Sequence, residues 1–438
     1  FVGQEVLHLS SAPTSEEDRL VRRNVVLRSF AVRSGGSYIA MLGGLARVGD
    51  DNSERRGVFV TEPNGQLAKD VWVVGSEPVA VPRIVARGRA VEEAGFIPAV
   101  SASIGMVPRV LSDFYWFGRY AERAEDLLRL VLATRTAAIE TDLDVTHGSA
   151  LEVLLQAVTH VSTTYPGFLN QGVEMMPEFR SLLLDRRRMG SAAQSLGALS
   201  MAAQGVRDQL SEDVWMVLAD IERALGGLAA NPYDQGLQLT DASERVLSGL
   251  LALAGIVTEN MVRDPGWYML DSGRGLERAL QILALLRVTI CRERAAETDR
   301  LVLEAVLSAA ETIVTCRRRY GTRPGVDAVL ELLVIDPVNP RSVAYQLQRI
   351  RTDIRALPNT SPTARPLRLL DALAERVRIA DPATLAESTN GRRAPLEEFL
   401  AGLQNQLRAL SEAIRDQYQQ PPPTQRPLFR TDAVGNTA

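Results

Sequence analysis

The chain has 438 residues, a formal net charge of −4 at neutral pH, and a composition that is 46% hydrophobic. That length allows about two to three domains with a sizeable core. The slight acidic excess excludes a general nucleic-acid binder, which needs a basic face, and no apolar run approaches the roughly 20 residues that cross a bilayer. We therefore expect neither nucleic acid nor a membrane as a partner.

The cysteine content points to a reducing compartment. Cys291 and Cys316 are too few for a disulfide framework, and both lie in apolar helical segments where a buried thiol is the ordinary outcome. A cytoplasmic location follows. The sequence opens at Phe1 without a basic and apolar targeting segment, so we also expect a fragment or a truncated gene product.

The first 75 residues predict strands. Short alternating runs such as 24–33 and 57–60 are separated by glycine pairs, which are strand and turn signals. About four or five strands with uncovered edges are too little for an independent domain, so we expect this small β or α+β fragment to complete a sheet supplied elsewhere. Residues 76–107 carry the prolines and glycines of a linker.

Nearly everything from residue 108 to residue 419 predicts helix. Apolar residues recur there at alternating spacings of three and four, which makes one apolar stripe on the first helix. The stripe consists of Val110, Phe114, Phe117, Ala121, Ala124, Leu128 and Val131. Similar periods continue to Tyr418 and predict a mainly-α bundle of about ten to twelve helices. Residues 420–438 are polar and proline-rich, so we expect a disordered tail.

One block of this region returns later in the chain. Residues 118–124 match residues 273–279 at an offset of about 155. A second match has an offset of about 151 and pairs segment 182–191 with segment 333–342. Two ordered matches with similar offsets indicate an internal duplication. We expect two copies of one helical unit, at about 108–230 and 262–390.

Six charged residues of the repeated motif form the candidate polar site: Arg119, Glu122, Arg123, Arg274, Glu277 and Arg278. A rotation of about 100° per residue places Glu122 and Arg123 away from the apolar stripe. Three hypotheses stay open. The motif faces water with weak surface pairs. Alternatively, a pseudo-twofold axis makes Glu122 meet Arg278 while Glu277 meets Arg123. In the third, the six residues line a polar cleft for an anionic or peptide-like ligand.

No catalytic constellation stands out in the sequence. The three histidines, His8, His147 and His160, are scattered, so we predict no metal site. Neither cysteine has a histidine nearby in sequence that would activate it as a nucleophile. Whether the helical region is an enzyme stays open.

Four short segments near the start of the chain share one resemblance: 1–5, 26–30, 43–48 and 69–72. They look like the C-terminal end of the circularly permuted ATP-grasp family. The resemblance implies ATP-dependent joining of a carboxylate to an amine. In a complete site of that family Arg28, Arg47 and Lys69 would contact nucleotide phosphates, and the alternative is that they are charges on the faces of strands. The glycine-rich loop and acidic metal ligands of that family have no counterpart in residues 1–75. ATP and Mg²⁺ are therefore expected only if the missing ATP-grasp portion is supplied.

Four segments of the helical region carry a second resemblance: 108–110, 114–125, 206–211 and 273–278. They are similar to the alpha-E family, an α-helical domain named for its Glu-Arg motif, and the likeness spans about 105–415. The resemblance implies the company of circularly permuted ATP-grasp proteins, beside which or fused to which the domain is commonly found. This sequence departs from the pattern at residues 188–190, where a pair like Asn339-Pro340 is expected.

Together these features predict a helical accessory module of an ATP-grasp-linked peptide or amide ligation system, which binds or presents a substrate or partner. The expected partners are the ATP-grasp portion or related operon-encoded enzymes, and a peptide or amino-acid ligand. Two alternatives remain. The helical domain is itself an enzyme that acts on the ligase's substrate or product, or it is a structural scaffold for homo-oligomers.

Overall fold

The computed structural model describes residues 10–16, 19–34, 37–40, 43–48, 68–71, 107–141, 148–170, 172–231, 236–358 and 360–420. The chain divides into two compact units, residues 1–95 and 96–438. The fold is mainly α with a small antiparallel β part near the N-terminus, as the sequence predicts. Apart from Val107 and Gln420, the predicted linker and tail lie outside the described residues.

The described strands of the first unit form one sheet and one hairpin. The sheet is antiparallel in the order β1 (Ser11–Glu16), β2 (Arg19–Arg28), β5 (Gly44–Val48) and β6 (Ala68–Val71). The hairpin pairs β3 (Ala31–Ser34) with β4 (Ser37–Ala40). The expected run at 24–33 is broken after Arg28, and the run at 57–60 lies outside the described residues.

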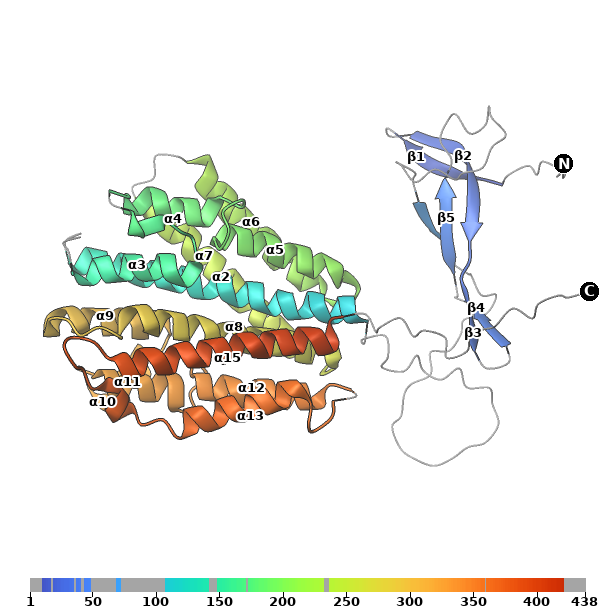
Figure 1. The fold of residues 1–438 in the computed structure, drawn as a ribbon. Helices are drawn as coiled ribbons and strands as arrows, with labels where there is room; N and C mark the ends of the chain where they lie inside the picture. The colour runs from blue at the N-terminus through green and yellow to red at the C-terminus, as the bar shows by residue number, and fades with distance from the viewer. Residues whose placement is uncertain are drawn as a thin grey trace, which may run out of the picture. The chain divides into compact units, whose positions relative to one another are not determined.

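Two long helices, α2 (Pro108–Glu140) and α8 (Pro265–Thr289), pack along each other at the centre of the second unit (Figure 1). Both begin with a proline, whose fixed backbone angle suits the first helical position. The side chain of Asp264 also caps α8 by accepting from the backbone nitrogen of Trp267.

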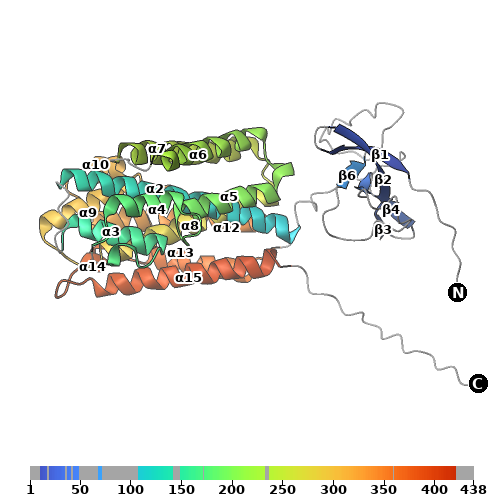
Figure 2. The same cartoon turned by 90° about the horizontal axis from the view of Figure 1, so that it is seen from above.

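The other helices surround this pair (Figure 2). After α2 come α3 (Ala150–Ser162), α4 (Met175–Leu184), α5 (Ala192–Gly205), α6 (Glu212–Ala230) and α7 (Leu237–Asn260). After α8 come α9 (Ala296–Ala309), α10 (Ile313–Tyr320), α11 (Val326–Leu330), α12 (Val343–Ala356), α13 (Arg365–Arg378), α14 (Pro382–Ala386) and α15 (Ala394–Tyr418). In the described part of the chain, no helix is both long and apolar enough to cross a bilayer.

The described residues contain fourteen α-helices, more than the ten to twelve expected. Three of them, α10, α11 and α14, have only five to eight residues, which is too short to show a helical period. The apolar period at 191–225 belongs to two helices, because the short turn Arg207–Gln209 separates α5 from α6.

Corresponding helices pack alike in the two parts of the bundle. Helix α2 packs on α5 as α8 packs on α12, and α6 packs on α7 as α13 packs on α15. Ser191 and Ser342 also make the same cap: each accepts from the backbone nitrogen three residues on and donates to an aspartate carbonyl six residues back. This is the arrangement that two copies of one unit would give. The boundaries of the copies stay a prediction.

The core explains why charged residues of α2 lie inside the protein. Five of the seven residues of its apolar stripe are buried, with Phe114 and Phe117 almost fully enclosed. The opposite side of α2 packs on α8, so it does not face water. A face that looks solvated from its sequence is therefore the contact between the two central helices.

Candidate functional site

The two central helices approach each other closely at a pair of glycines. A Cβ on Gly118 would lie 2.1 Å from the carbonyl oxygen of Leu270, and a Cβ on Gly273 would lie 2.3 Å from that of Tyr115. The positions match in pairs at an offset of 155 residues. Glycine at both positions therefore permits a nearly symmetric helix crossing, which brings the next turns of both helices together.

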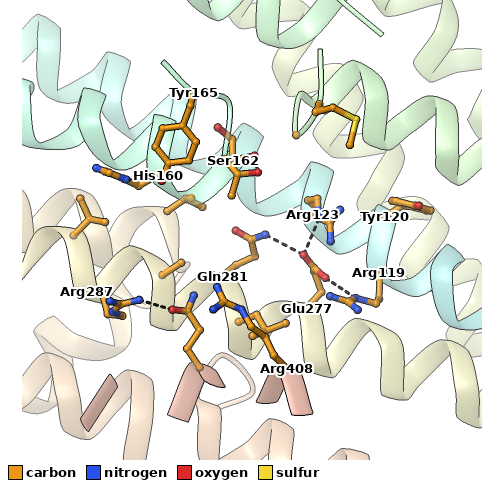
Figure 3. A pocket seen from close by; sticks show the side chains of 18 of the residues that line it. Arg119, Tyr120, Arg123, His160, Ser162, Tyr165, Glu277, Gln281, Arg287 and Arg408 are labelled. Atoms are coloured by element: carbon orange, nitrogen blue, oxygen red, sulfur yellow. Dashed lines mark hydrogen bonds and ion pairs between the residues drawn. The ribbon is translucent and has the colours of Figure 1, made fainter. Parts of the chain in front are cut away.

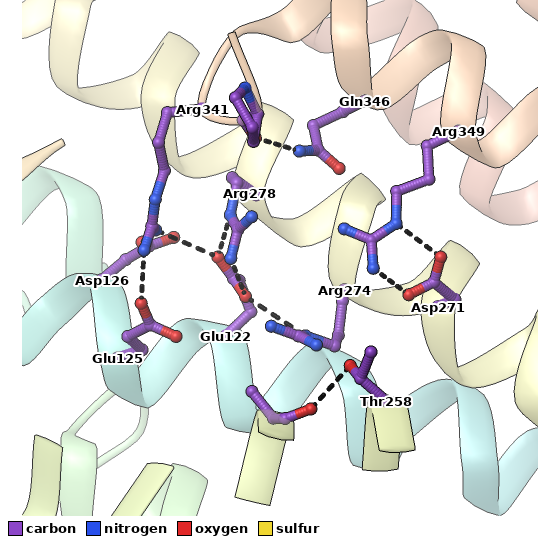
Figure 4. Close-up of polar contacts among 12 residues, drawn as sticks. Glu122, Glu125, Asp126, Thr258, Asp271, Arg274, Arg278, Arg341, Gln346 and Arg349 are labelled. Atoms are coloured by element: carbon purple, nitrogen blue, oxygen red, sulfur yellow. Dashed lines mark hydrogen bonds and ion pairs between the residues drawn. The ribbon is translucent and has the colours of Figure 1, made fainter. Parts of the chain in front are cut away.

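The two motif glutamates lie one turn beyond the crossing, and each is held by arginines of the other helix. Glu122 Oε2 accepts from Arg278 Nη2 at 2.8 Å, with a second, shorter bond between Oε1 and Nε, and Arg274 Nε lies 3.6 Å from Oε2. Glu277 accepts from Arg119 Nε at 2.6 Å and from Arg123 Nε at 2.8 Å. The structure thus contains the reciprocal pairs of the second hypothesis (Figures 3 and 4).

The same geometry shows that the solvated-face hypothesis is wrong for the glutamates. Glu122 is 1% exposed and Glu277 is 2% exposed. Burial alone would raise the pKa of Glu277, but the charges of Arg119 and Arg123 outweigh it and lower that pKa to about 2. Glu277 is therefore ionised at neutral pH and is a weak base.

The surroundings of the two glutamates differ, although both are held by arginines of the opposite helix. We call the side of Glu122 the filled half and the side of Glu277 the open half. In the filled half, Arg341 Nη2 donates to Glu125 Oε1 at 2.8 Å and its Nη1 lies 3.8 Å from Asp126 (Figure 4). The remaining empty space beside Glu122 is about 10 Å³. The Arg341 side chain thus lies among the acidic residues of this half.

The open half has small or neutral residues at the corresponding positions. At the offset of 151, Gly190 stands where the filled half has Arg341. At the offset of 155, Leu280 and Gln281 replace Glu125 and Asp126. Gly190 has a left-handed φ of +83°, and a Cβ there would lie 1.9 Å from the Ser162 carbonyl oxygen, so a larger residue does not fit in this backbone.

A cavity of about 680 Å³ occupies the open half, between α2, the end of α3, the start of α5, α8 and α15 (Figure 3). That volume is in the usual range for small-ligand sites. Its charged lining consists of four arginines and two glutamates: Arg119, Arg123, Arg287, Arg408, Glu277 and Glu397. The positive excess favours an anionic ligand.

The rest of the wall is polar and aromatic. Trp116 and Tyr120 stack with ring centres 5.2 Å apart, and the Arg119 guanidinium lies 4.9 Å from the Trp116 ring. His160 Nδ1 lies 2.9 Å from the Tyr165 hydroxyl. Burial lowers the pKa of His160, which keeps the imidazole neutral at pH 7. The aromatic wall thus adds no positive charge beyond that of the arginines.

The candidate residues from the sequence divide between the two halves. Arg119, Arg123 and Glu277 line the cavity, whereas Glu122, Arg274 and Arg278 belong to the filled half. Sequence reasoning did not place several other residues in this wall. Four of them are far from the motif along the chain: His160, Tyr165, Gln404 and Arg408. The fifth, Arg287, lies nine residues after Arg278 on α8. One available signal was Arg287, a cation in an apolar run at the position where the first copy has Leu132.

The residues suggested for nucleotide binding do not share one face of the β-sheet. Arg28 lies opposite Leu45, so it shares a face with Arg47. Lys69 lies opposite Ala46 and therefore points to the other face. These described residues do not form a single phosphate site by themselves, and their nucleotide-binding role stays a prediction.

No metal centre or reactive thiol is evident in the described residues. They contain no group of three or more histidine, cysteine, aspartate or glutamate side chains that could hold a metal ion. Both cysteines are buried, and burial raises the pKa of Cys291 to about 11 and also raises that of Cys316. The thiols are protonated at neutral pH and are weak nucleophiles.

Comparison with known proteins places this geometry in a family. A protein of Mycobacterium tuberculosis strain H37Rv is 37% identical over 451 residues, and one of Mycobacterium bovis is 36% identical over the same length. Both are described as uncharacterised, and each match covers 99% of this chain and 50% of the relative. The chain thus spans about half the length of these relatives. No solved structure matches it.

The family comparison covers the whole helical bundle. A family model matches residues 106–418 and is described as "a predicted alpha-helical domain with a conserved ER motif". In this structure the two Glu-Arg segments are the ones that hold α2 against α8. The chain belongs to the alpha-E family.

Proposed function

We propose that the helical domain is an accessory module of an ATP-grasp-linked peptide or amide ligation system, and that it holds a peptide or amino-acid ligand in the open half. The observation that carries this proposal is the 680 Å³ cavity with four arginines in its wall. A purely structural duplication would not need one half to be open while the other is filled by Arg341.

The chemistry of the cavity favours binding over catalysis. Glu277 is the buried carboxylate of the wall, and its pKa of about 2 makes it a poor general base. The two cysteines are protonated at neutral pH. These properties suit a site that holds a ligand while the bond-forming step takes place elsewhere.

The ligation setting rests on the resemblance of residues 1–75 to the end of a circularly permuted ATP-grasp domain. The described residues of this segment do not fit a complete nucleotide site, because Lys69 and the two arginines lie on opposite faces of the sheet. The described residues of this segment therefore do not supply an ATP-dependent step by themselves. The ATP-grasp portion is the proposed partner that would supply it.

A ligation assay tests the proposal. The chain is combined with an ATP-grasp portion, and ADP release is measured over amino-acid and short-peptide acceptors. The variant Ala284→Trp puts a bulky side chain into the cavity wall. We expect acceptor-dependent ADP release to fall at least tenfold, because the ligand and the indole would compete for one space.

The control is Ala219→Trp, on the exposed surface of α6. It should leave ADP release unchanged. If Ala284→Trp folds normally and ADP release equals that of the unmodified chain, or if omitting the helical domain changes nothing, the accessory role is wrong.

A further inference from the structure

Two cations in the cavity have no carboxylate partner among the residues that the structure describes. Arg287 Nη1 donates to the Gln404 amide oxygen at 2.6 Å, and its buried Nε has no acceptor among the described residues. Arg408, exposed on α15, makes a long hydrogen bond of 3.4 Å to Asn405. In the part of the chain that the structure describes, neither guanidinium has a carboxylate within 4.0 Å. Neutral amides leave both charges uncompensated.

The arginines of the Glu-Arg motif are less suited to an incoming anion. Arg119 is buried, and both Arg119 and Arg123 donate to Glu277 through Nε. Gln281 donates to the same carboxylate at 3.0 Å. An anion that took these donors would leave the buried charge of Glu277 without partners, which is unfavourable. The motif therefore holds the wall together, and the cations available to a ligand are Arg287 and Arg408.

The filled half indicates which kind of anion is missing. There, the carboxylates of Glu125 and Asp126 lie beside Arg341. The open half has Leu280 and Gln281 in place of these two acids and gains Arg287 in place of Leu132. Two carboxylates are lost, together with the guanidiniums of Arg129 and Arg341, whose positions hold Ala284 and Gly190. One guanidinium is gained, so the formal charge of the open half is more positive by one. A ligand carboxylate would restore the balance of charge that the filled half has internally.

The shape of the donors also favours a carboxylate. A guanidinium pairs best with two coplanar oxygens. Arg287 already uses one nitrogen for Gln404, and its Nε has no acceptor in the described part of the chain. The Gln281 and Gln404 amides in the same wall can bond the peptide groups of a short ligand. Figure 3 shows Arg287 and Arg408 reaching into the cavity with Gln281 nearby.

We propose that Arg287 and Arg408, and not the Glu-Arg motif, bind the free carboxylate of an amino acid or short peptide in this cavity. The proposal rests on the function proposed above and specifies how the ligand is recognised. Phosphate shares the same donor chemistry, so the test must separate the two anions.

Calorimetric titration of the full chain tests this recognition. The probes are tri-L-alanine, tri-L-alanine amide, L-glutamate and inorganic phosphate. We expect a carboxylate probe to bind, and tri-L-alanine amide to bind at least tenfold more weakly than tri-L-alanine. The variants Arg287→Gln and Arg408→Gln should each weaken carboxylate binding about tenfold or more, because one charge-assisted pair is lost.

Two further variants keep the outcome interpretable. Arg287→Lys retains the charge but not the planar fork, so its loss should be smaller than that of Arg287→Gln. Arg245→Gln, an exposed arginine of α7 that pairs with Asp241, should bind like the unmodified chain. Melting temperatures equal to that of the unmodified chain show that the variants fold.

Three results would overturn the proposal: no binding of either carboxylate probe, equal binding by Arg287→Gln, or phosphate binding at least as tight as the carboxylates. The ligation assay separates this failure from failure of the proposed function. If Ala284→Trp lowers ADP release but Arg287→Gln does not, the cavity holds a ligand by other contacts and only this assignment is wrong.

Discussion

The open and filled halves of the central cluster share one motif and differ in what surrounds it. Glu122 and Glu277 each meet an arginine pair from the opposite helix. Around Glu122 the space is taken by Arg341 and two acids, whereas around Glu277 it is a cavity. Two halves that share one motif can therefore keep the same ion pairs and differ in whether a cavity lies beside them.

Loss of a buried Glu-Arg pair, which both halves contain, should have the largest effect on the free energy of unfolding. Glu122→Ala should lower the free energy of unfolding by about 3–5 kcal/mol, because Arg278 stays buried without its carboxylate. Urea denaturation measures this change. The control Glu375→Ala removes an exposed pair with Arg378 on α13 and should change stability by at most about 1 kcal/mol. If Glu122→Ala unfolds at nearly the same urea concentration as the control, the buried pairs contribute little to the free energy of unfolding.

Loss of Arg341, which only the filled half has, should have a smaller effect on the free energy of unfolding. Arg341→Ala should lower the free energy of unfolding by about 1–3 kcal/mol, because Glu125 and Asp126 lose a charged donor in a partly buried site. The matched control is Arg351→Ala, whose partner Asp371 is exposed on α13. If both variants melt alike, Arg341 only occupies space in the filled half and does not stabilise it.

Much of this comparison could be predicted from the sequence. The period of three and four predicts the bundle, and the offset of the two motifs suggests the pairing of Glu122 with Arg278. Burial of Glu122 could not be predicted in the same way. A surface helix has one apolar face and one charged face. A helix packed on both sides shows the same sequence pattern when the charges of its second face are paired inside the protein. That second face becomes clear only when α8 is placed against it.

The cavity was harder to predict for a different reason. Its wall combines residues from five separate segments, and Arg408 lies almost 300 positions from Arg119 along the chain. The departure at residues 188–190 was visible in the sequence. Its consequence is an empty space in the open half, where the filled half has the Arg341 side chain. That space depends on the backbone at Gly190 and on the end of α3. Local patterns do not contain that information.

The filled half also contains a pair of acids that the open half lacks, and their expected effect is a dependence of the melting temperature on pH. Asp271 and Asp353 correspond to Trp116 and Ala202 at the offsets of 155 and 151 residues. Burial, and then the charge of neighbouring Asp271, raise the pKa of Asp353 to about 9, although Arg349 and Arg263 oppose this shift. Asp353 is therefore protonated in the folded protein at neutral pH.

Because the folded-state pKa of Asp353 lies above the unfolded value near 3.9, its contribution to stability is fully present below about pH 4 and is lost as pH rises toward 9. Asp353→Asn cannot ionise, and its amide can still donate to Asp271. The variant should melt like the unmodified chain at pH 5 and a few degrees higher at pH 8. Asp371→Asn, an exposed acid, should show no such pH-dependent gain. If the melting temperatures of Asp353→Asn and of the unmodified chain change equally with pH, Asp353 is ionised in the folded protein. The filled half would then tolerate an extra negative charge.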